Sequence, residues 1–548
     1  MPISGKYRKI SEFFILLILF FGALVTRVPL LETHPPGLWY DEAINGLDGL
    51  SILGNIKEVP EIIKTGGFPL FFTTEQHPRE PLYMYFVCLM FLFVKPTVFS
   101  LRAVSGVLGA ITVPIVYLLV RTGSKNRKFG LASALALLTM RWHIHQSRLA
   151  LRTILVPLWL SLFFWSFFLA MEKRKKSLWI ISGAIFGLGF YTHLSFRFAP
   201  FILVCLVLFC FKKRSISWRE DGISLILFCL CAFLVFLPLG IDYLMNPFHF
   251  WGRMQEVSLF ANGFEKGITQ IFKNSIRAMG MFSIRGDMNP FLNLAGAPVF
   301  TIGASFFFYL GFIICLRRIK TRKEGEFYFS LFPWIGIMLF ATILSADCPH
   351  FSRSLGAAVP AAVFVGCGLT ESYEWLVDFF RKKRAVIFIG IIWIGLSAWD
   401  LSLYFIRYRG SRSLWHRTNA AWVDVAREAK VLAKEQVRIY LPEDMYNHPS
   451  VKYLSLNVSR EKLLPMKFPE VLTGFLQGAK QDHVVLVTQH NHLYPLFQKE
   501  IPSGEVVRIF RSPEGTNWAL FYRIHSNSLI PPSRAEEIVR IYKPETKR

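Results

Sequence analysis

The sequence predicts a polytopic α-helical membrane protein of about 11–13 spanning helices, followed by a small soluble α/β domain. Hydrophobic residues make up 53% and aromatic residues 16% of the 548 residues, and the mean hydropathy is +0.39. Such values lie well above those of soluble domains. Runs rich in Phe, Leu and Ile recur from residue 13 to about 405, and the composition changes from about residue 411. We therefore expect a membrane domain over 1–410 and a second domain over 411–548.

Short bursts of basic residues indicate which side of the membrane each loop faces. The net charge is +25, and lysine and arginine gather between the apolar runs, in KNRK (125–128), EKRKK (172–176), KKR (212–214), RRIKTRK (317–323) and RKKR (381–384). This spacing is typical of the positive-inside rule, whereas nucleic-acid binding would require a continuous basic surface. We therefore place these bursts in the cytoplasm and expect no nucleic-acid partner.

Eleven crossings satisfy that orientation. The expected spans are 12–28, 103–120, 129–142, 154–171, 178–191, 198–211, 222–240, 299–315, 327–344, 355–371 and 385–405. A further full crossing by the apolar segment 82–94 would place basic bursts on the wrong side of the membrane. We therefore interpret this segment as re-entrant or interfacial. Residues 29–81 and 241–297 then form two large external segments. The first run lacks a small-x-small cleavage site and is read as a retained helix.

The tail is predicted to be an external α/β domain. Residues 415–436 have the 3.6-residue periodicity of an amphipathic helix. We expect strands at 437–441, 483–489, 506–510 and 518–524, and helices near 468–477 and 533–542. The tail contains neither GxGxxG nor a P-loop, so nothing in it indicates a nucleotide site.

An acidic pair, Asp41 and Glu42, follows the first apolar run in WYDEAINGLDGL. A carboxylate at a membrane boundary can act as a general base because it holds a free lone pair at neutral pH. The alternative is a solvated pair or a helix cap, since Asp is favoured at helix starts.

Further polar clusters fall on the same predicted side. The candidate residues are His77, Arg79 and Glu80, then His143, Arg148 and Arg152, then His193 and Arg197, then Asp287, and finally His350 and Arg353. Arginine outside the cytoplasm opposes the usual charge bias, and a bound phosphate would offset it because guanidinium groups bind phosphate oxygens in a bidentate manner. Snorkelling side chains at helix ends are the alternative for each cluster taken singly.

Together the clusters describe an external cavity with a carboxylate and several cations. Because nucleotide sugars are absent outside the cytoplasm, sugar transfer there draws on a lipid-phosphate donor. Such a reaction needs cations for the anionic leaving group, a base for the acceptor, and an apolar groove for the prenyl chain. This sequence offers candidates for all three.

Five ordered motifs carry a family resemblance: WYDEA (39–43), HPREPLY (77–83), SLRAVSGVLGAITVPIVYLL (100–119), WHIHQSRLALRTILVP (142–157) and GLGFYTHLSFRFAP (187–200). Over about residues 12–405 the chain resembles bacterial membrane-integral glycosyltransferases of the family 39 type. These C-fold enzymes are akin to protein O-mannosyltransferases and lipid A aminoarabinose transferases. The resemblance implies a polyprenyl-phosphate sugar donor, inversion at the anomeric carbon, and Asp41 as the catalytic carboxylate, with Glu42 completing the motif.

One departure from the family pattern concerns metal. Many C-fold enzymes carry an acidic residue in the second external loop, but here that loop reads SRLALRTILVP. We therefore expect no metal ligands and favour cations for phosphate stabilisation, with a divalent cation as the open alternative and Glu80 as a substitute carboxylate. The expected phosphate-binding residues are Arg79, Arg148, Arg152, His193, Arg197 and Arg353, and the other candidates are His77, Glu80, His143, Asp287 and His350.

The sequence thus predicts a glycosyltransferase of the inner or plasma membrane, with its active face and tail domain periplasmic or extracellular. Its partners would be the polyprenyl-phosphate sugar, membrane lipid and an acceptor that the sequence does not name. A transporter or lipid flippase is the alternative, although charges at one face and the lack of an internal repeat disfavour it.

Overall fold

The computed structural model describes residues 5–54, 70–72, 78–257, 259, 264–466, 481–488, 495, 498–499 and 503–526. The chain divides into two compact units. Among the described residues, the first comprises 5–32, 48–54 and the chain from 70 to 410, and the second comprises 33–47 and the chain from 411 onward. The predicted helices at 468–477 and 533–542 lie outside the described residues.

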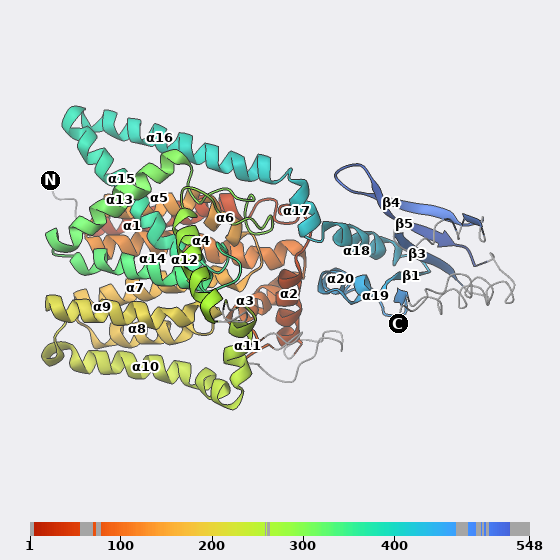
Figure 1. Cartoon of the computed structure of the whole chain (residues 1–548), viewed down its shortest axis with the longest axis horizontal. Helices are drawn as coiled ribbons and strands as arrows, with labels where there is room; N and C mark the ends of the chain where they lie inside the picture. Colours follow the sequence, from red (N-terminus) through yellow and green to blue (C-terminus); the bar gives the residue numbers. More distant parts are fainter. Residues whose placement is uncertain are drawn as a thin grey trace. The chain divides into compact units, whose positions relative to one another are not determined.

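The first unit is a bundle of helices (Figure 1). Its elements are α1 (Gly5–Arg27), α3 (Leu82–Phe93), α4 (Val98–Ser124), α5 (Arg127–Thr139), α6 (Arg141–Ser147), η3 (Arg152–Ile154), α7 (Leu155–Lys173), α8 (Lys176–Gly189), η4 (Leu194–Phe198), α9 (Ala199–Lys213), α10 (Trp218–Met245), α11 (Pro247–Val257), α12 (Phe264–Gly280), α13 (Ile302–Thr321), α14 (Gly325–Ile343), η6 (Leu355–Ala357), α15 (Ala358–Phe379), α16 (Lys382–Ser402) and η7 (Leu403–Tyr408). Helix α2 (Tyr40–Leu53) contains the boundary between the two units.

Each predicted crossing corresponds to a helix, but two of these helices are short. Within the described part of the chain, nine helices are long and apolar enough to span a membrane. Helix α5 has 13 residues and α8 has 14, so each is ~20 Å long, less than the ~30 Å of a hydrocarbon core. Their ends continue directly into α6 and η4, respectively, by short turns. Helix α3, predicted to be a partial segment, has only 12 residues.

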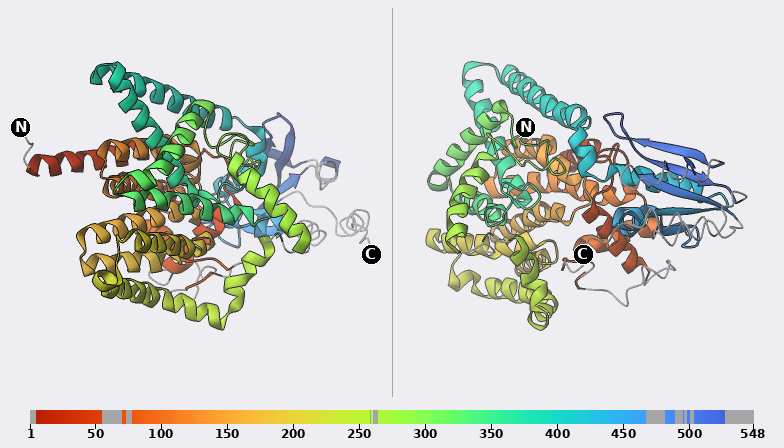
Figure 2. Two further views of the ribbon diagram at one scale, coloured as in Figure 1. Left: turned by 60° about the vertical axis from the view of Figure 1, so that its left-hand side comes forward. Right: turned by 45° about the vertical axis from the view of Figure 1, so that its right-hand side comes forward.

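Burial separates inner from outer helices. The apolar windows of α4, α7 and α15 are mostly buried, whereas those of α1, α10 and α16 are largely exposed. Helices α10 and α16 lie at opposite edges of the bundle in all three views (Figures 1 and 2). Because most of their exposed large apolar residues are Ile, Leu and Phe, these faces suit a lipid rather than an aqueous environment.

A pair of glycines allows α8 and α10 to pack closely. A Cβ atom at Gly183 would lie 2.3 Å from the carbonyl oxygen of Phe228, and one at Gly187 would lie 2.6 Å from that of Ala232. The two glycines are one helical turn apart, and this small-xxx-small spacing brings helix backbones together in membranes.

The second unit contains a five-stranded mixed sheet. Its strands are β1 (Val437–Pro442), β2 (Leu463–Met466), β3 (Asp482–Thr488), β4 (Glu505–Arg511) and β5 (Asn517–Ile524), in the order β2-β1-β3-β5-β4. Strand β1 is parallel to β2 and β3, and β5 is antiparallel to β3 and β4. Helix α18 (Ala420–Leu432) buries Val425, Ala426 and Ala429 against the sheet, and the unit also includes α17 (Arg412–Arg417), α19 (Glu443–Asn447) and α20 (Pro449–Leu454).

Residues 33–47 belong to this second unit although they precede its other residues by hundreds of positions in the sequence. The Ser450 hydroxyl donates to the Leu38 carbonyl at 2.7 Å, across 412 residues of chain. Gly37 adopts a φ of +73°, and a Cβ there would lie 2.2 Å from the Thr418 carbonyl oxygen. The acidic motif is therefore part of the same compact unit as the sheet.

Replacing Gly183 with leucine is expected to destabilise the bundle. The new side chain would force α8 from α10, and overpacking of this kind costs roughly 1–3 kcal/mol or more. We expect the thermal unfolding midpoint of Gly183→Leu in detergent to be lower than that of wild type. The measurement is size-exclusion chromatography of heated samples, which detects the protein lost to aggregation. Gly336→Leu in α14 is the matched control because a Cβ at Gly336 meets nothing within 4 Å. Equal midpoints for the two variants would contradict this account of the packing.

Candidate active site

The acidic pair divides into an exposed and a buried carboxylate. Both lie in the first turn of α2, where Asp41 is exposed and Glu42 is buried. Glu42 Oε2 accepts a hydrogen bond from the Trp39 N–H at 3.0 Å, which is the return half of a capping box. Glu42 therefore fixes the start of the helix, and Asp41 is the carboxylate left accessible to a reactant.

Glu80 joins two arginines in the first unit. Its Oε2 lies 2.7 Å from Arg152 Nη1 and its Oε1 lies 3.1 Å from Arg197 Nη2. The Glu80 side chain is only 2% exposed. Arg197 also donates to the Tyr243 hydroxyl at 3.1 Å. One carboxylate thus holds two guanidinium groups from segments far apart in the sequence.

His193 lies among these cations as a neutral imidazole. It precedes η4, and its Nδ1 accepts a hydrogen bond from the Ser195 N–H at 3.2 Å. Burial lowers the pKa of His193 well below its usual value, and the nearby guanidinium groups of Arg152, Arg197 and Arg353 lower it further. Because Nδ1 is the acceptor, the proton of the neutral ring is on Nε2, which can donate to an anion.

Arg353 extends the positive charge. Its Nη1 is buried and has no hydrogen-bond partner among the described residues. Burial lowers the pKa of Arg353, partly offset by the Asp347 and Asp287 carboxylates. We call Glu80, Arg152, His193, Arg197 and Arg353 the cationic cluster. It contains three guanidinium groups and one carboxylate.

Asp287 and His350 support the Arg353 segment. The Asp287 carboxylate accepts from the backbone N–H groups of Asn289 and Phe351, both at 2.8 Å, and burial raises the Asp287 pKa to about 6. His350 Nδ1 accepts from the Arg353 N–H at 3.3 Å, and burial lowers the His350 pKa to about 3. Both side chains therefore tie together the loops that carry Arg353.

Arg79 pairs with Asp48, a residue that the sequence interpretation missed. Arg79 Nη2 lies 2.7 Å from Asp48 Oδ2, and both side chains are less than 10% exposed. Asp48 lies on α2, about two helical turns after Asp41, so the two carboxylates share one helix face. That spacing is the signal that could have singled out Asp48.

Arg148 and His143 belong to a separate buried network. Arg148 is fully buried, donates to the Arg27 carbonyl at 3.2 Å and lies over the Phe405 ring. His143 Nδ1 accepts from Arg27 Nη2 at 3.0 Å. These contacts hold α6 and its C-terminal end against α1 and η7, and they indicate packing rather than phosphate binding.

The structure thus brings together Glu80, Arg152, His193, Arg197 and Arg353 from the predicted candidates. His77 lies outside the described residues. Tyr243 and Asp48 are additional contacts that sequence reasoning did not find. Among the described residues, no three His, Cys, Asp or Glu side chains are grouped so that they could hold a metal ion.

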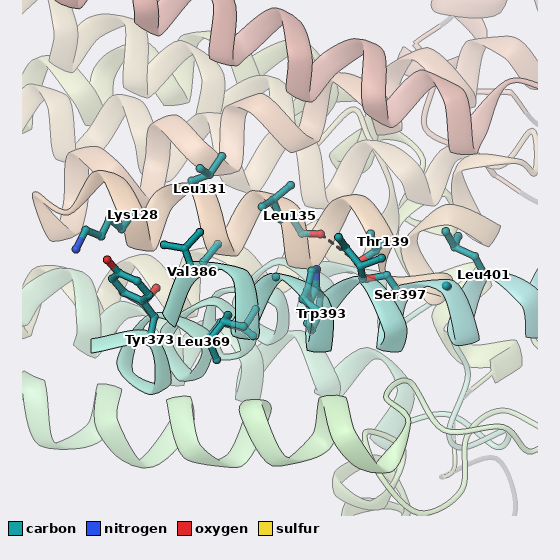
Figure 3. A pocket seen from close by; sticks show the side chains of 16 residues that line it. Lys128, Leu131, Leu135, Thr139, Leu369, Tyr373, Val386, Trp393, Ser397 and Leu401 are labelled. Atoms are coloured by element: carbon teal, nitrogen blue, oxygen red, sulfur yellow. Dashed lines mark hydrogen bonds between the residues drawn. The ribbon is translucent and has the colours of Figure 1, made fainter. Parts of the chain in front are cut away.

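An apolar groove runs between α5, α15 and α16 (Figure 3). Its volume is about 760 Å³, and its walls include Leu135, Leu369 and Trp393. Lys128 and Tyr373 lie at one end and Leu401 at the other (Figure 3). The Lys128 ammonium lies 4.7 Å from the centre of the Tyr373 ring. A groove of this length and polarity suits an extended hydrocarbon chain.

Comparison with known families matches residues 76–241 to dolichyl-phosphate-mannose-protein mannosyltransferases. No curated protein sequence matches the chain.

Two solved membrane glycosyltransferases have similar folds. ArnT from Cupriavidus metallidurans, bound to undecaprenyl phosphate, is 11% identical, with a TM-score of 0.55 and coverage of 96% of this chain and 100% of that one. The oligosaccharyltransferase of Archaeoglobus fulgidus in its apo form is 13% identical, with a TM-score of 0.54 and coverage of 95% and 75%, respectively. At these identities the likeness establishes the fold, a C-fold membrane bundle with an appended domain.

Acid is expected to destabilise the protein through His145. This residue is 2% exposed, its Nε2 contacts the Phe291 carbonyl at 2.7 Å and its Nδ1 contacts the Tyr404 hydroxyl at 3.1 Å. Burial lowers the His145 pKa to about 3, so between about pH 6.5 and 3 the unfolded state binds the extra proton. The His145 contribution is complete above pH 6.5 and is lost as the pH falls.

The measurement is unfolding of the detergent-solubilised protein between pH 7.5 and 4.5. His145→Gln retains groups that can contact Phe291 and Tyr404, and its stability should fall less steeply with acid, by up to about 1.4 kcal/mol per pH unit. Parallel pH profiles for wild type and variant would show that His145 is not a source of the acid sensitivity.

Proposed function

We propose that the chain is a C-fold glycosyltransferase of the family 39 type, and that it moves a sugar from a polyprenyl-phosphate donor to an acceptor outside the cytoplasm. The match of residues 76–241 to dolichyl-phosphate-mannose-protein mannosyltransferases supports this proposal. The observation that carries the proposal is the cationic cluster, in which two guanidinium groups share the Glu80 carboxylate and a third, that of Arg353, lies near His193. The undecaprenyl phosphate bound by ArnT and the dolichol phosphate bound by AglB of A. fulgidus, which is 14% identical with a TM-score of 0.50, support this donor class.

The charge of the cluster fits the leaving group. A sugar phosphodiester carries one negative charge, and the polyprenyl phosphate released from it carries close to two at neutral pH. The negative charge therefore grows as the bond between the anomeric carbon and the phosphate oxygen breaks. Fixed cations at that oxygen stabilise the transition state more than the ground state. Arg353 and the Nε2–H of His193 are the groups best suited to this role, because Glu80 already pairs Arg152 and Arg197.

Asp41 is proposed as the general base. It is the exposed member of the acidic pair, and Glu42 and the Trp39 N–H fix the helix turn that presents it. In a single displacement the acceptor oxygen or nitrogen attacks the anomeric carbon, its proton passes to Asp41, and the phosphate leaves from the opposite face. The anomeric configuration is then inverted. Glu42 holds the helix start and takes no proton.

The groove between α5, α15 and α16 is the proposed site for the prenyl chain. Its walls are apolar over most of their length (Figure 3). Because the prenyl chain comes from the bilayer hydrocarbon, close packing rather than transfer from water would hold it there. The positive-inside distribution of the basic bursts supports an external position for the cationic cluster.

Asp41→Asn is expected to abolish transfer without unfolding the protein. An amide has no lone pair basic enough to take the acceptor proton, so the rate should fall at least about 100-fold. The measurement is label release from a panel of radiolabelled polyprenyl-phosphate sugars by purified enzyme with membrane-extract acceptors. Asp378→Asn, an exposed carboxylate on α15, is the matched control. Normal turnover by Asp41→Asn would remove Asp41 from the mechanism.

Arg353→Gln is expected to weaken donor use. Loss of one cation at a developing anion typically costs about 10²–10³ in rate, and Arg353→Lys should recover part of it because the charge remains. The readout is kcat and KM for the donor at saturating acceptor, with the exposed Arg381→Gln as control. If Arg353→Gln leaves both constants unchanged, the phosphate does not bind at Arg353.

A further inference from the structure

The second unit contains an aromatic pocket that the proposed chemistry does not use. It lies between the end of α17, the start of α18 and the turn that joins β4 to β5, and its volume is about 450 Å³. Three tryptophans, Trp415, Trp422 and Trp518, line it. A volume of this size falls within the usual range for small-molecule sites.

Two of the indoles are held by neighbouring rings. Trp422 packs edge-on against His448, with ring centres 4.5 Å apart. Trp518 packs against Phe510, with ring centres 5.8 Å apart. Rings fixed in this way lose little entropy when a ligand binds, so the pocket is pre-organised.

Polar groups complete the lining. His416 Nε2 lies 3.3 Å from Glu514 Oε1, and both side chains remain accessible. Asn419 also lines the pocket, with a φ of +54°. A non-glycine residue in the left-handed region stores backbone strain, which is often found at binding sites. Its position between α17 and α18 brings the Asn419 amide to the pocket.

The composition of the pocket selects a class of ligand. The described residues that line the pocket include no lysine or arginine, so a phosphate or a nucleotide would find no compensating cation among them. A purely apolar ligand would cover the imidazole, carboxylate and amide and offer them no hydrogen bond beyond the His416–Glu514 contact. A pyranose ring satisfies both sets of groups, because its C–H faces stack on indoles and its hydroxyl groups donate and accept at the edge.

The pocket is packed against the segment that carries the acidic pair. His448 contacts Trp422 on one side and the Tyr40 ring on the other, with ring centres 5.4 Å apart in the second contact. Tyr40 immediately precedes Asp41. The start of α18, which forms one wall of the pocket, is also where Gly37 packs. The indole wall and the acidic motif are thus one packed structure.

We propose that this pocket binds a sugar ring of a carbohydrate acceptor. The assignment to the acceptor rests on the proposed function, because a donor sugar would bring its phosphate into a pocket whose described lining carries no lysine or arginine. Occupancy of the pocket would hold the acceptor on the same unit as Asp41, through the Trp422–His448–Tyr40 contacts.

Sugar binding is tested first, without any lipid donor. The probes are methyl glycosides of common hexoses, pentoses and N-acetylhexosamines, measured by saturation-transfer NMR with the full chain in detergent. We expect one or more of them to bind, and Trp415→Ala and Glu514→Gln each to weaken binding at least tenfold. Trp375→Ala removes an indole that is 49% exposed on α15 and should have no effect. Binding by no glycoside, or equal binding by all variants, would overturn the proposal.

Transfer assays separate this inference from the proposed function. With an active donor, Trp415→Ala and Glu514→Gln should raise the KM for a glycan acceptor while the donor KM stays constant. An unchanged acceptor KM, or use of a peptide acceptor unaffected by either variant, would overturn the pocket assignment and leave the transferase intact. Glycoside binding that depends on Trp415, together with no transfer from any polyprenyl-phosphate sugar, would support the pocket and contradict the proposed donor.

Discussion

The buried Glu80 carboxylate is the interaction on which the bundle end that carries the cationic cluster depends. Arg152 begins the helical segment that continues as α7, and Arg197 lies in η4, so without Glu80 two guanidinium groups would approach each other with little water to screen them. Burying like charges is costly unless a counter-charge lies between them. With Glu80 in place, η3 and η4 are tied together, and His193, at the start of η4, is fixed in position with them. The geometry of the cationic cluster is therefore a consequence of one shared ion pair.

The start of helix α2 is held by contacts within the second unit. Glu42 accepts a hydrogen bond from the Trp39 N–H, and the Tyr40 ring packs against His448. These contacts fix the helix turn that presents Asp41. A carboxylate proposed to take a proton in one geometry benefits from such restriction.

Most of the fold followed from apolar run length and basic bursts, and those signals are strong because lipid requires helices whose backbone is internally satisfied. The strand β2 was missed because it is four residues long and contains a proline.

The candidate site was only partly predictable from the sequence. Arg148 and Arg152 stand four positions apart in one motif, yet Arg148 donates to the Arg27 carbonyl whereas Arg152 pairs with Glu80. Spacing placed both at the same bundle end, but only tertiary packing distinguishes a structural guanidinium from one in the cationic cluster.

In the proposed reaction, the Glu80 carboxylate would also tune how tightly the cationic cluster binds the phosphate. Three guanidinium groups alone would bind the doubly charged product more tightly than the singly charged donor, and product release would become slow. Glu80 reduces the formal charge of the cluster from three to two, which matches the phosphate at the end of the reaction without exceeding it. An enzyme gains rate from binding that grows toward the transition state, but binding that continues to grow afterwards delays turnover. In the proposed reaction, the paired carboxylate would therefore serve the chemistry as well as the packing, because it would limit how strongly the leaving group is held.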